Sequence, residues 1–161
     1  FPSQEYFIGN LMDYYIQKGK IDEGLTQMDA VLAKNSTPYF MYVKGVLQYE
    51  KKDYDGAIAT FNQIIAEGKD FVAEAYSKIG DCSFFPAQEI VEENSKLSMD
   101  DPKYAANEAK IKELYEKAFP FYEKAKEAKP DNRQLWGQYL LNIYWKLDKE
   151  KYNALEKELG Y

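Results

Sequence analysis

Residues 38–69 read PYFMYVKGVLQYEKKDYDGAIATFNQIIAEGK, and this stretch decides the fold. Apolar side chains recur every three to four positions on both sides of a short charged turn at residues 51–53, which is the spacing of amphipathic helices. Pro38 stands where it can start a helix, and Gly68 stands where it can end one. The stretch therefore predicts two antiparallel helices joined as a hairpin.

The same pattern occurs on both sides of this hairpin, which indicates an internal repeat. The closing helix, residues 149–159, has a largely polar outer face, as expected of the terminal cap of a repeat array. We predict a single domain over residues 1–161. Its repeats cover approximately residues 5–37, 38–70, 71–131 and 132–161, the last being the C-terminal cap.

These hairpins resemble the tetratricopeptide repeat (TPR) family. That family places small residues at positions 8 and 20 of a 34-residue repeat, where the two helices cross closely, and Gly45 and Ala57 take these positions here. The resemblance implies an all-α fold, a right-handed α-α superhelix of antiparallel helix pairs. The interval of 12 residues between the two positions recurs from Met12 to Gly24 and from Leu140 to Tyr152.

The third repeat departs from this spacing. Gly80 and Ala118 match its two small positions, but 38 residues separate them instead of 12, so 26 residues are inserted. The inserted segment, around residues 89–113, has helical patterning on both sides of a polar turn, and Asp101-Pro102 is a helix-start signal. We predict that both helices of this repeat are elongated into a long hairpin. Long arms of this shape resemble those of TPR proteins from Bacteroidetes.

Composition narrows the function classes. The net charge of −6 and the pI near 4.9 argue against nucleic acid or an anionic membrane as the partner. No apolar run reaches the roughly 18 residues of a membrane-spanning helix, and no secretory signal opens the sequence. Because the chain opens abruptly, we interpret it as a fragment of a longer protein. The Bacteroidetes resemblance favours an exported or periplasmic location over the cytoplasm.

Few residues are suited to catalysis or metal binding. The sequence has no histidine, which removes the commonest general base and the commonest transition-metal ligand. The single cysteine, Cys82, lies beside Gly80 in a helical pattern and is predicted to be a buried small side chain. Acidic pairs such as Glu92-Glu93 lack calcium-loop spacing, and no phosphate-binding loop or nucleophile motif is present. We predict no catalytic site, no metal and no cofactor.

The TPR resemblance implies a concave groove lined by the first helix of each repeat. With 15 tyrosines, the chain is rich in a residue that suits binding surfaces because one end is apolar and the other polar. We predict a non-catalytic module that binds a peptide or protein segment in this groove. The groove candidates are Tyr6, Asn10, Asp13, Tyr39, Tyr42, Val46, Tyr49, Lys78, Asp81, Tyr144 and Trp145.

Two alternatives accompany this prediction. Several of these rings are also suited to packing between adjacent helices. The sequence therefore leaves two alternatives for each ring, contact with a ligand or packing within the fold. A structural module that self-associates into a homo-oligomer, through the long hairpin or through repeat edges, is the second function class. The carboxylate clamp of chaperone-tail adaptors is not predicted, since only the last of its five positions keeps its charge: Gly9, Asp13, Val43, Glu74 and Lys78.

Overall fold

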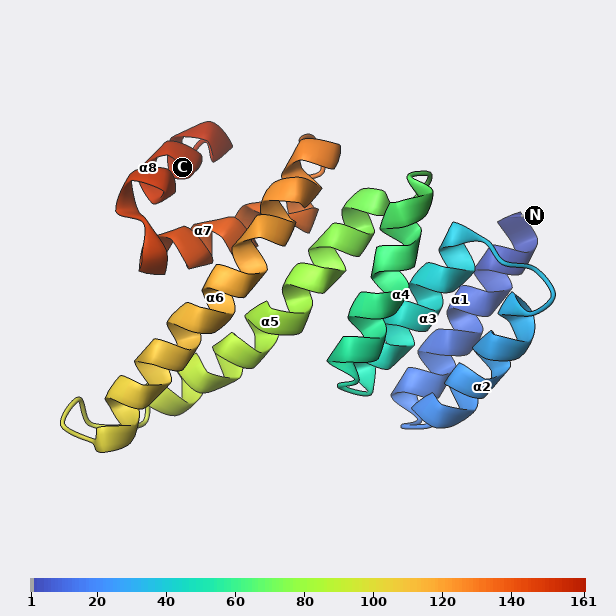
Figure 1. Cartoon of the computed structure of the whole chain (residues 1–161), viewed down its shortest axis with the longest axis horizontal. Helices are drawn as coiled ribbons and strands as arrows, with labels where there is room; N and C mark the ends of the chain where they lie inside the picture. Colours follow the sequence, from blue (N-terminus) through green and yellow to red (C-terminus); the bar gives the residue numbers. More distant parts are fainter. Residues whose placement is uncertain (1) are drawn as a thin grey trace. The chain divides into compact units, whose positions relative to one another are not determined.

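A computed structural model shows an all-helical chain, as predicted (Figure 1). The structure describes residues 2–161, with side chains from Glu5 onward. No strand occurs among these residues, and helical hairpins follow one another along the chain. The helices are α1 (Pro2–Gln17), α2 (Ile21–Leu32), α3 (Pro38–Glu50), α4 (Tyr54–Glu67), α5 (Val72–Asn94), α6 (Pro102–Ala128), α7 (Gly137–Leu147) and α8 (Lys149–Leu159), with a short 3-10 turn, η1, at Arg133–Leu135.

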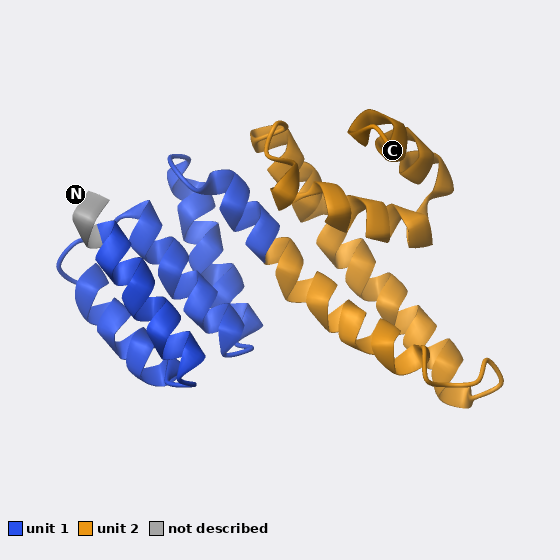
Figure 2. Cartoon of the chain, turned by 180° about the vertical axis from the view of Figure 1, so that it is seen from behind, with its two compact units in different colours: residues 1–78 blue, residues 79–161 orange. Residues whose placement is uncertain are grey.

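The chain divides into two compact units, residues 1–78 and residues 79–161 (Figure 2). The boundary falls inside α5. We call them unit 1 and unit 2 and describe each by itself. The repeat bounds given above, and their union in one domain, stay a prediction.

Unit 1 has the helix boundaries that its local sequence predicts. Thr37 precedes the Pro38 start of α3, and its side chain accepts a hydrogen bond from the Phe40 amide at 3.2 Å. Asp53 caps α4 in the same way, accepting from the Gly56 amide at 3.1 Å. Gly68 ends α4 with φ +64°, a left-handed conformation that glycine adopts without a steric penalty. The hairpin of residues 38–69 is therefore confirmed.

Two layers of contact hold unit 1 together. In the first, Met12 of α1, Met28 of α2 and Leu47 of α3 are all buried in one cluster. In the second, α3 crosses α4 at Gly45, where an added Cβ would lie 2.5 Å from Cε1 of Phe61. The small residue at this position thus allows the ring of Phe61, which is fully buried, to pack against the backbone of α3.

Unit 2 is built around the long hairpin. α5 has 23 residues and α6 has 27, against 11 to 16 for the other α-helices of the described chain, so the predicted elongation is confirmed. Figure 1 shows the two helices side by side with their connection at the far end. Asp101 caps α6 and accepts from the Lys103 amide at 2.8 Å, ahead of Pro102 at the first helical position.

The crossing of α5 and α6 repeats the device seen in unit 1. A Cβ added to Gly80 would lie 2.8 Å from Cζ of Tyr122, a ring that is fully buried. The Tyr122 hydroxyl donates to Oδ1 of Asp81 at 2.7 Å. The ring of Tyr139 is stacked on that of Tyr122, with ring centroids 4.6 Å apart and planes at 6°. Cys82, on the same part of α5, is buried as predicted.

The C-terminal helices complete unit 2. α7 packs against α6 and α8 through buried residues that include Leu140 and Ile143. Trp136, just before α7, is 1% exposed and donates from Nε1 to the Lys129 carbonyl oxygen at 3.2 Å. Leu155 is the buried residue of α8, and most of the exposed positions of that helix are Lys, Glu or Asn.

Candidate functional site

A hollow of about 230 Å³ lies between α1 and α3 of unit 1. Its base consists of core side chains of the two helices. Tyrosine rings and one carboxylate add polar groups to a lining that is otherwise apolar. The lining residues are Gly9, Met12, Asp13, Ile16, Tyr39, Tyr42, Val43, Val46 and Leu47.

Tyr39 is fixed at one wall of this hollow. Its hydroxyl donates to the Glu5 carbonyl oxygen at 3.0 Å, which ties α3 to α1. Burial raises the pKa of Tyr39, and the carboxylates of Glu5 and Asp13 raise it further. Tyr39 therefore keeps its proton and acts as an anchored, neutral ring.

Tyr42 is held at the same hollow by other rings. It stacks on Phe71 with centroids 5.4 Å apart and planes at 26°, and it lies 5.9 Å from the ring of Phe61. Phe71 also approaches Tyr39, at 5.7 Å. Phe71 has φ +65°, a conformation that costs free energy for a residue with a bulky side chain. The ring contacts of Phe71 offset that cost and restrict the motion of Tyr42.

Four other sequence-predicted residues of unit 1 lie outside this hollow. Tyr6 is 75% exposed, and the exposed Asn10 donates from Nδ2 to the Tyr6 carbonyl oxygen at 2.8 Å, within α1. Lys78 places Nζ 5.3 Å from the ring centroid of Tyr49, a cation–π contact. Tyr49 and Lys78 thus meet each other and do not join the hollow.

Two of the predicted groove residues, Asp81 and Tyr144, have buried side chains, because partners far along the chain hold them inward. Asp81 is 1% exposed and accepts the hydrogen bond of Tyr122. Tyr144 is 7% exposed and donates to Oε1 of Glu123 at 2.5 Å. Burial raises the pKa of the Tyr144 hydroxyl well above its usual range, and its bond to the Glu123 carboxylate adds to that rise. Neither side chain is available to a ligand.

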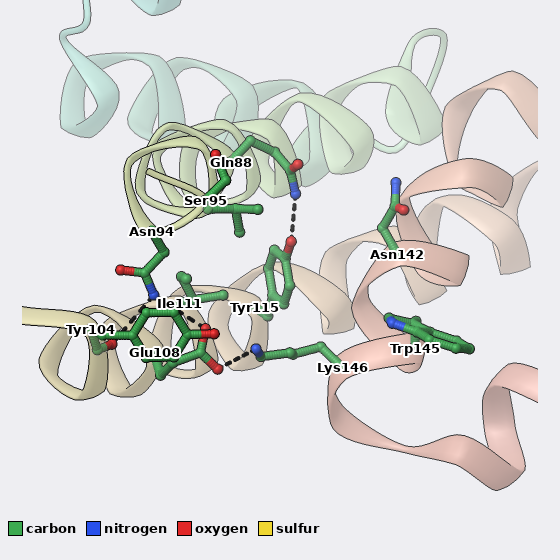
Figure 3. Close-up of a pocket in the computed structure, with 11 residues that line it drawn as sticks. Gln88, Asn94, Ser95, Tyr104, Glu108, Ile111, Tyr115, Asn142, Trp145 and Lys146 are labelled. Carbon is green, nitrogen blue, oxygen red and sulfur yellow. Dashed lines mark hydrogen bonds and ion pairs between the residues drawn. The ribbon is translucent and has the colours of Figure 1, made fainter. Parts of the chain in front are cut away.

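A second hollow, of about 390 Å³, lies in unit 2 between α5, α6 and α7 (Figure 3). Of the predicted residues it contains Trp145, which is 63% exposed. Its lining mixes aromatic, aliphatic and neutral polar groups with one acid and one base. The lining residues are Gln88, Val91, Asn94, Ser95, Tyr104, Glu108, Ile111, Tyr115, Asn142, Trp145 and Lys146.

Hydrogen bonds fix the wall that α5 and α6 contribute. Gln88 donates from Nε2 to the Tyr115 hydroxyl at 2.5 Å. Asn94 is 5% exposed and donates from Nδ2 to the Tyr104 carbonyl oxygen and to Oε1 of Glu108, both at 3.3 Å, while its Oδ1 has no partner among the described residues. The other Glu108 oxygen pairs with Lys146 of α7, as the dashed line in Figure 3 marks.

The wall from α7 follows from helical periodicity. Asn142, Trp145 and Lys146 are spaced three and four positions apart, so they share the face opposite the buried one. Lys149 places Nζ 3.7 Å from the Trp145 ring centroid, which covers one face of that ring. Sequence reasoning missed Gln88, Asn142 and Lys146. The spacing around Trp145 was the signal that pointed to the two α7 residues.

Both hollows offer groups that suit non-covalent contact. Each offers aromatic rings, apolar surface and hydrogen-bonding groups. In the part of the chain that the structure describes, no three His, Cys, Asp or Glu side chains gather where they would hold a metal ion. None of the described helices combines the length and apolar character needed to cross a bilayer.

The fold and the two hollows together define the class of protein. It consists of consecutive helical hairpins with surface hollows suited to non-covalent contact. The family model of the tetratricopeptide repeat matches residues 10–70, which include most of α1 and all of α2 to α4. Residues 10–70 therefore form tetratricopeptide repeats, as the sequence predicted, and the match ends before α5. No curated protein matches the sequence. Tetratricopeptide repeats generally mediate protein–protein interaction and are generally non-catalytic. The resemblance to Bacteroidetes proteins stays a prediction.

Proposed function

We propose that this chain is a non-catalytic interaction module and that the α1–α3 hollow of unit 1 binds a peptide or protein segment. The observation that supports this is a convergence. Asp13, Tyr39, Tyr42 and Val46, which the repeat pattern assigns to a binding face, line one hollow.

The size and lining of the hollow favour a segment of a larger partner. At about 230 Å³ it is smaller than the roughly 300–1,000 Å³ of typical small-molecule pockets. It has room for the side chains of a bound segment whose main chain stays outside. Val46 and the ring of Tyr42 would contact apolar side chains, while the exposed Asp13 would accept from a donor or cation at the rim.

Ring pre-positioning is the physical basis of affinity in this proposal. Phe71 and Phe61 hold Tyr42, and the Glu5 carbonyl holds Tyr39, before any partner arrives. Less side-chain entropy is then lost on binding, by about 0.5–1.5 kcal/mol for each side chain that is already ordered. Large aromatic residues held in this way are the usual hot spots of protein interfaces.

The test is a selection of phage-displayed random peptides on the whole chain, followed by anisotropy titration of the enriched peptides. Tyr42→Ala is expected to weaken at least one enriched class by tenfold or more, about 1.4 kcal/mol. Tyr14→Ala is the matched control, since Tyr14 is 49% exposed on α1 and lies outside the hollow. Circular dichroism checks that both variants are folded. Equal binding by Tyr42→Ala and the parent chain for every enriched class would contradict the proposal.

Self-association is a second candidate, supported by a different observation. Phe7 and Tyr6 on α1 are 64% and 75% exposed, and Met99 in the α5–α6 connection is 81% exposed. Exposed apolar groups of this size often mark contact surfaces. Sedimentation velocity of Phe7→Ser and Met99→Ser, against the parent chain, tests this. If either surface mediates a dimer, its variant becomes monomeric, and an unchanged oligomeric state for both removes the candidate.

A further inference from the structure

We propose that the hollow of unit 2 is a second binding site, which clamps the main chain of an extended, uncharged peptide segment between the amides of Gln88 and Asn142. This inference does not rest on the proposed role of unit 1. It gives the inserted residues of the long hairpin a function.

The insertion builds one side of the hollow. Asn94, Tyr104 and Glu108 all lie in the segment around residues 89–113 that regular repeat spacing would omit. These residues form the wall that faces α7 in Figure 3. A hairpin of ordinary length would leave that face of α7 uncovered, so the hollow is a product of the elongated helices.

Charge argues against an ionic ligand. Glu108 and Lys146 are the only charged residues in the lining, and they pair with each other. The second Glu108 oxygen is already held by Asn94. A phosphate, carboxylate or ammonium group would have to break this pair to find a counter-charge. The hollow therefore selects neutral polar groups.

The groups left over match a peptide bond. Gln88 engages Nε2 with Tyr115, and its carbonyl oxygen has no partner in the described chain. The side-chain amide of Asn142 and Nε1 of Trp145 also have no hydrogen-bond partner among the described residues. A primary amide both donates and accepts, as do the N–H and C=O of successive peptide units. Two such amides on facing helices can hold one extended main chain.

The aromatic rings favour a peptide over a carbohydrate. A sugar ring usually stacks on an open aromatic face, but Lys149 covers one face of Trp145. Tyr115 is 4% exposed and is stacked on Phe84, with centroids 5.7 Å apart. The parts of these rings that line the hollow remain for contact with aliphatic side chains, beside Ile111 and Val91.

The length of the surface favours an extended segment. A further hollow of about 350 Å³ adjoins this one and shares Glu108 and Lys146 with it, along with Ala109, Lys112 and Leu147. The Glu108–Lys146 pair thus lies between two hollows of similar size. An extended chain, at about 3.3 Å per residue, can occupy both and pass over the ion pair, which a compact small molecule would not do.

The first test uses the same random-peptide selection on the whole chain and sorts the enriched peptides by variant. Gln88→Ala and Asn142→Ala are each expected to weaken one class by about tenfold, as the loss of a hydrogen bond to a neutral group predicts. Tyr42→Ala should leave that class unchanged. Asn62→Ala is the matched control, because Asn62 is an exposed amide on α4. Trp145 emission reports occupancy, since Trp136 is 1% exposed and responds little.

The second test asks whether the main chain is recognised. Esters replace successive peptide bonds of an enriched peptide, which removes one N–H donor at a time. At least one ester should weaken binding by about tenfold in the parent chain and by much less in Asn142→Ala or Gln88→Ala, as a coupled pair requires. The proposal is overturned if no enriched class is weakened by both variants or if every ester binds equally well.

Discussion

The α3–α4 and α5–α6 crossings use one device with different chemistry. Each places a glycine of the first helix against a ring of the second, Gly45 against Phe61 and Gly80 against Tyr122. In the short hairpin the contact of Gly45 with Phe61 is apolar, and Thr60, the neighbour of Phe61, donates from Oγ1 to Oε1 of Gln48 at 2.6 Å across the same two helices. In the long hairpin the ring carries a hydroxyl that donates to Asp81, and the ring of Tyr139 is stacked on it.

This difference bears on how the longer hairpin, α5–α6, keeps the register of its two helices. In the short hairpin the hydrogen bond between the helices comes from Thr60, so the ring of Phe61 is held by packing alone. In the long hairpin the bond comes from the ring of Tyr122 itself, which requires one register and one orientation of that ring. The long hairpin extends well past its crossing, so a small rotation there would displace the distant connection most. The hydroxyl of Tyr122 fixes the register of α5 and α6 at their crossing, from which the rest of the hairpin extends.

The largest effect is expected for Cβ atoms added at the two crossings. Gly45→Ala should lower the free energy of unfolding by about 2 kcal/mol, and Gly80→Ala by about 3 kcal/mol, because overpacking forces a buried ring to move. Tyr122 has less freedom than Phe61, since both its hydroxyl and its face are engaged. Urea denaturation measures both values. Gly137→Ala is the control, because its nearest neighbour would be 3.7 Å away. A larger loss for Gly45→Ala would reverse the comparison.

Removing only the hydroxyl should cost less. Tyr122→Phe keeps the ring and leaves the buried Asp81 carboxyl without this donor, which is expected to cost about 2 kcal/mol. Amide exchange along α5 and α6 should rise beyond the crossing if the bond fixes the register. Tyr14→Phe, at an exposed ring, should stay within about 0.5 kcal/mol. Unchanged exchange in the long hairpin would show that packing alone sets its register.

The helix caps offer a smaller contrast. Asp53→Ala and Asp101→Ala each remove a side-chain acceptor at the start of the second helix of a hairpin, worth about 1 kcal/mol. We expect Asp53→Ala to lower the melting temperature, because α4, which it caps, contributes the buried Phe61 and Ile64 to unit 1. Asp101→Ala should instead raise amide exchange in the first turn of α6, far from its crossing. Asn at either position should restore the cap. An equal loss of melting temperature for both would contradict this.

The smallest effect is on alkaline stability. The folded state raises the pKa of Tyr144 above 10.0, mainly through burial, so it favours the protonated hydroxyl. The stabilisation is fully present below pH 10.0 and is lost as the pH rises above it. Tyr144→Phe should therefore reduce the loss of melting temperature at alkaline pH. The reduction should be partial, since Tyr39 and Tyr115 also have raised pKa values. An identical alkaline profile would contradict the burial of Tyr144.

Local signals in the sequence were sufficient for the helices and their ends. The excess of 26 residues between Gly80 and Ala118 predicted the elongated helices, and Asp101-Pro102 predicted where α6 begins. These features depend on neighbouring residues and on repeat spacing, both of which can be counted. The close approach at Gly45 and Gly80 was implied in the same way by the repeat positions.

Features that depend on distant partners were not predictable in this way. Assigning Asp81 to a groove assumes that each first helix exposes the same face, but its partner Tyr122 lies 41 positions later. Tyr144 pairs with Glu123, 21 positions earlier. Gln88 and Asn142 line one hollow only because three helices meet there. No repeat position describes the inserted residues, so periodicity gave no guide to that surface.

The buried cysteine allows local opening at the crossing of α5 and α6 to be measured by thiol modification. Cys82 is the only thiol in the chain and is 5% exposed, two positions from Gly80. A thiol reagent can modify it only after this part of α5 opens, so the rate of modification measures how often opening occurs. The reagent does not react in unit 1, because that unit has no thiol. One unmodified protein thus reports the local opening kinetics of its long hairpin separately from global unfolding.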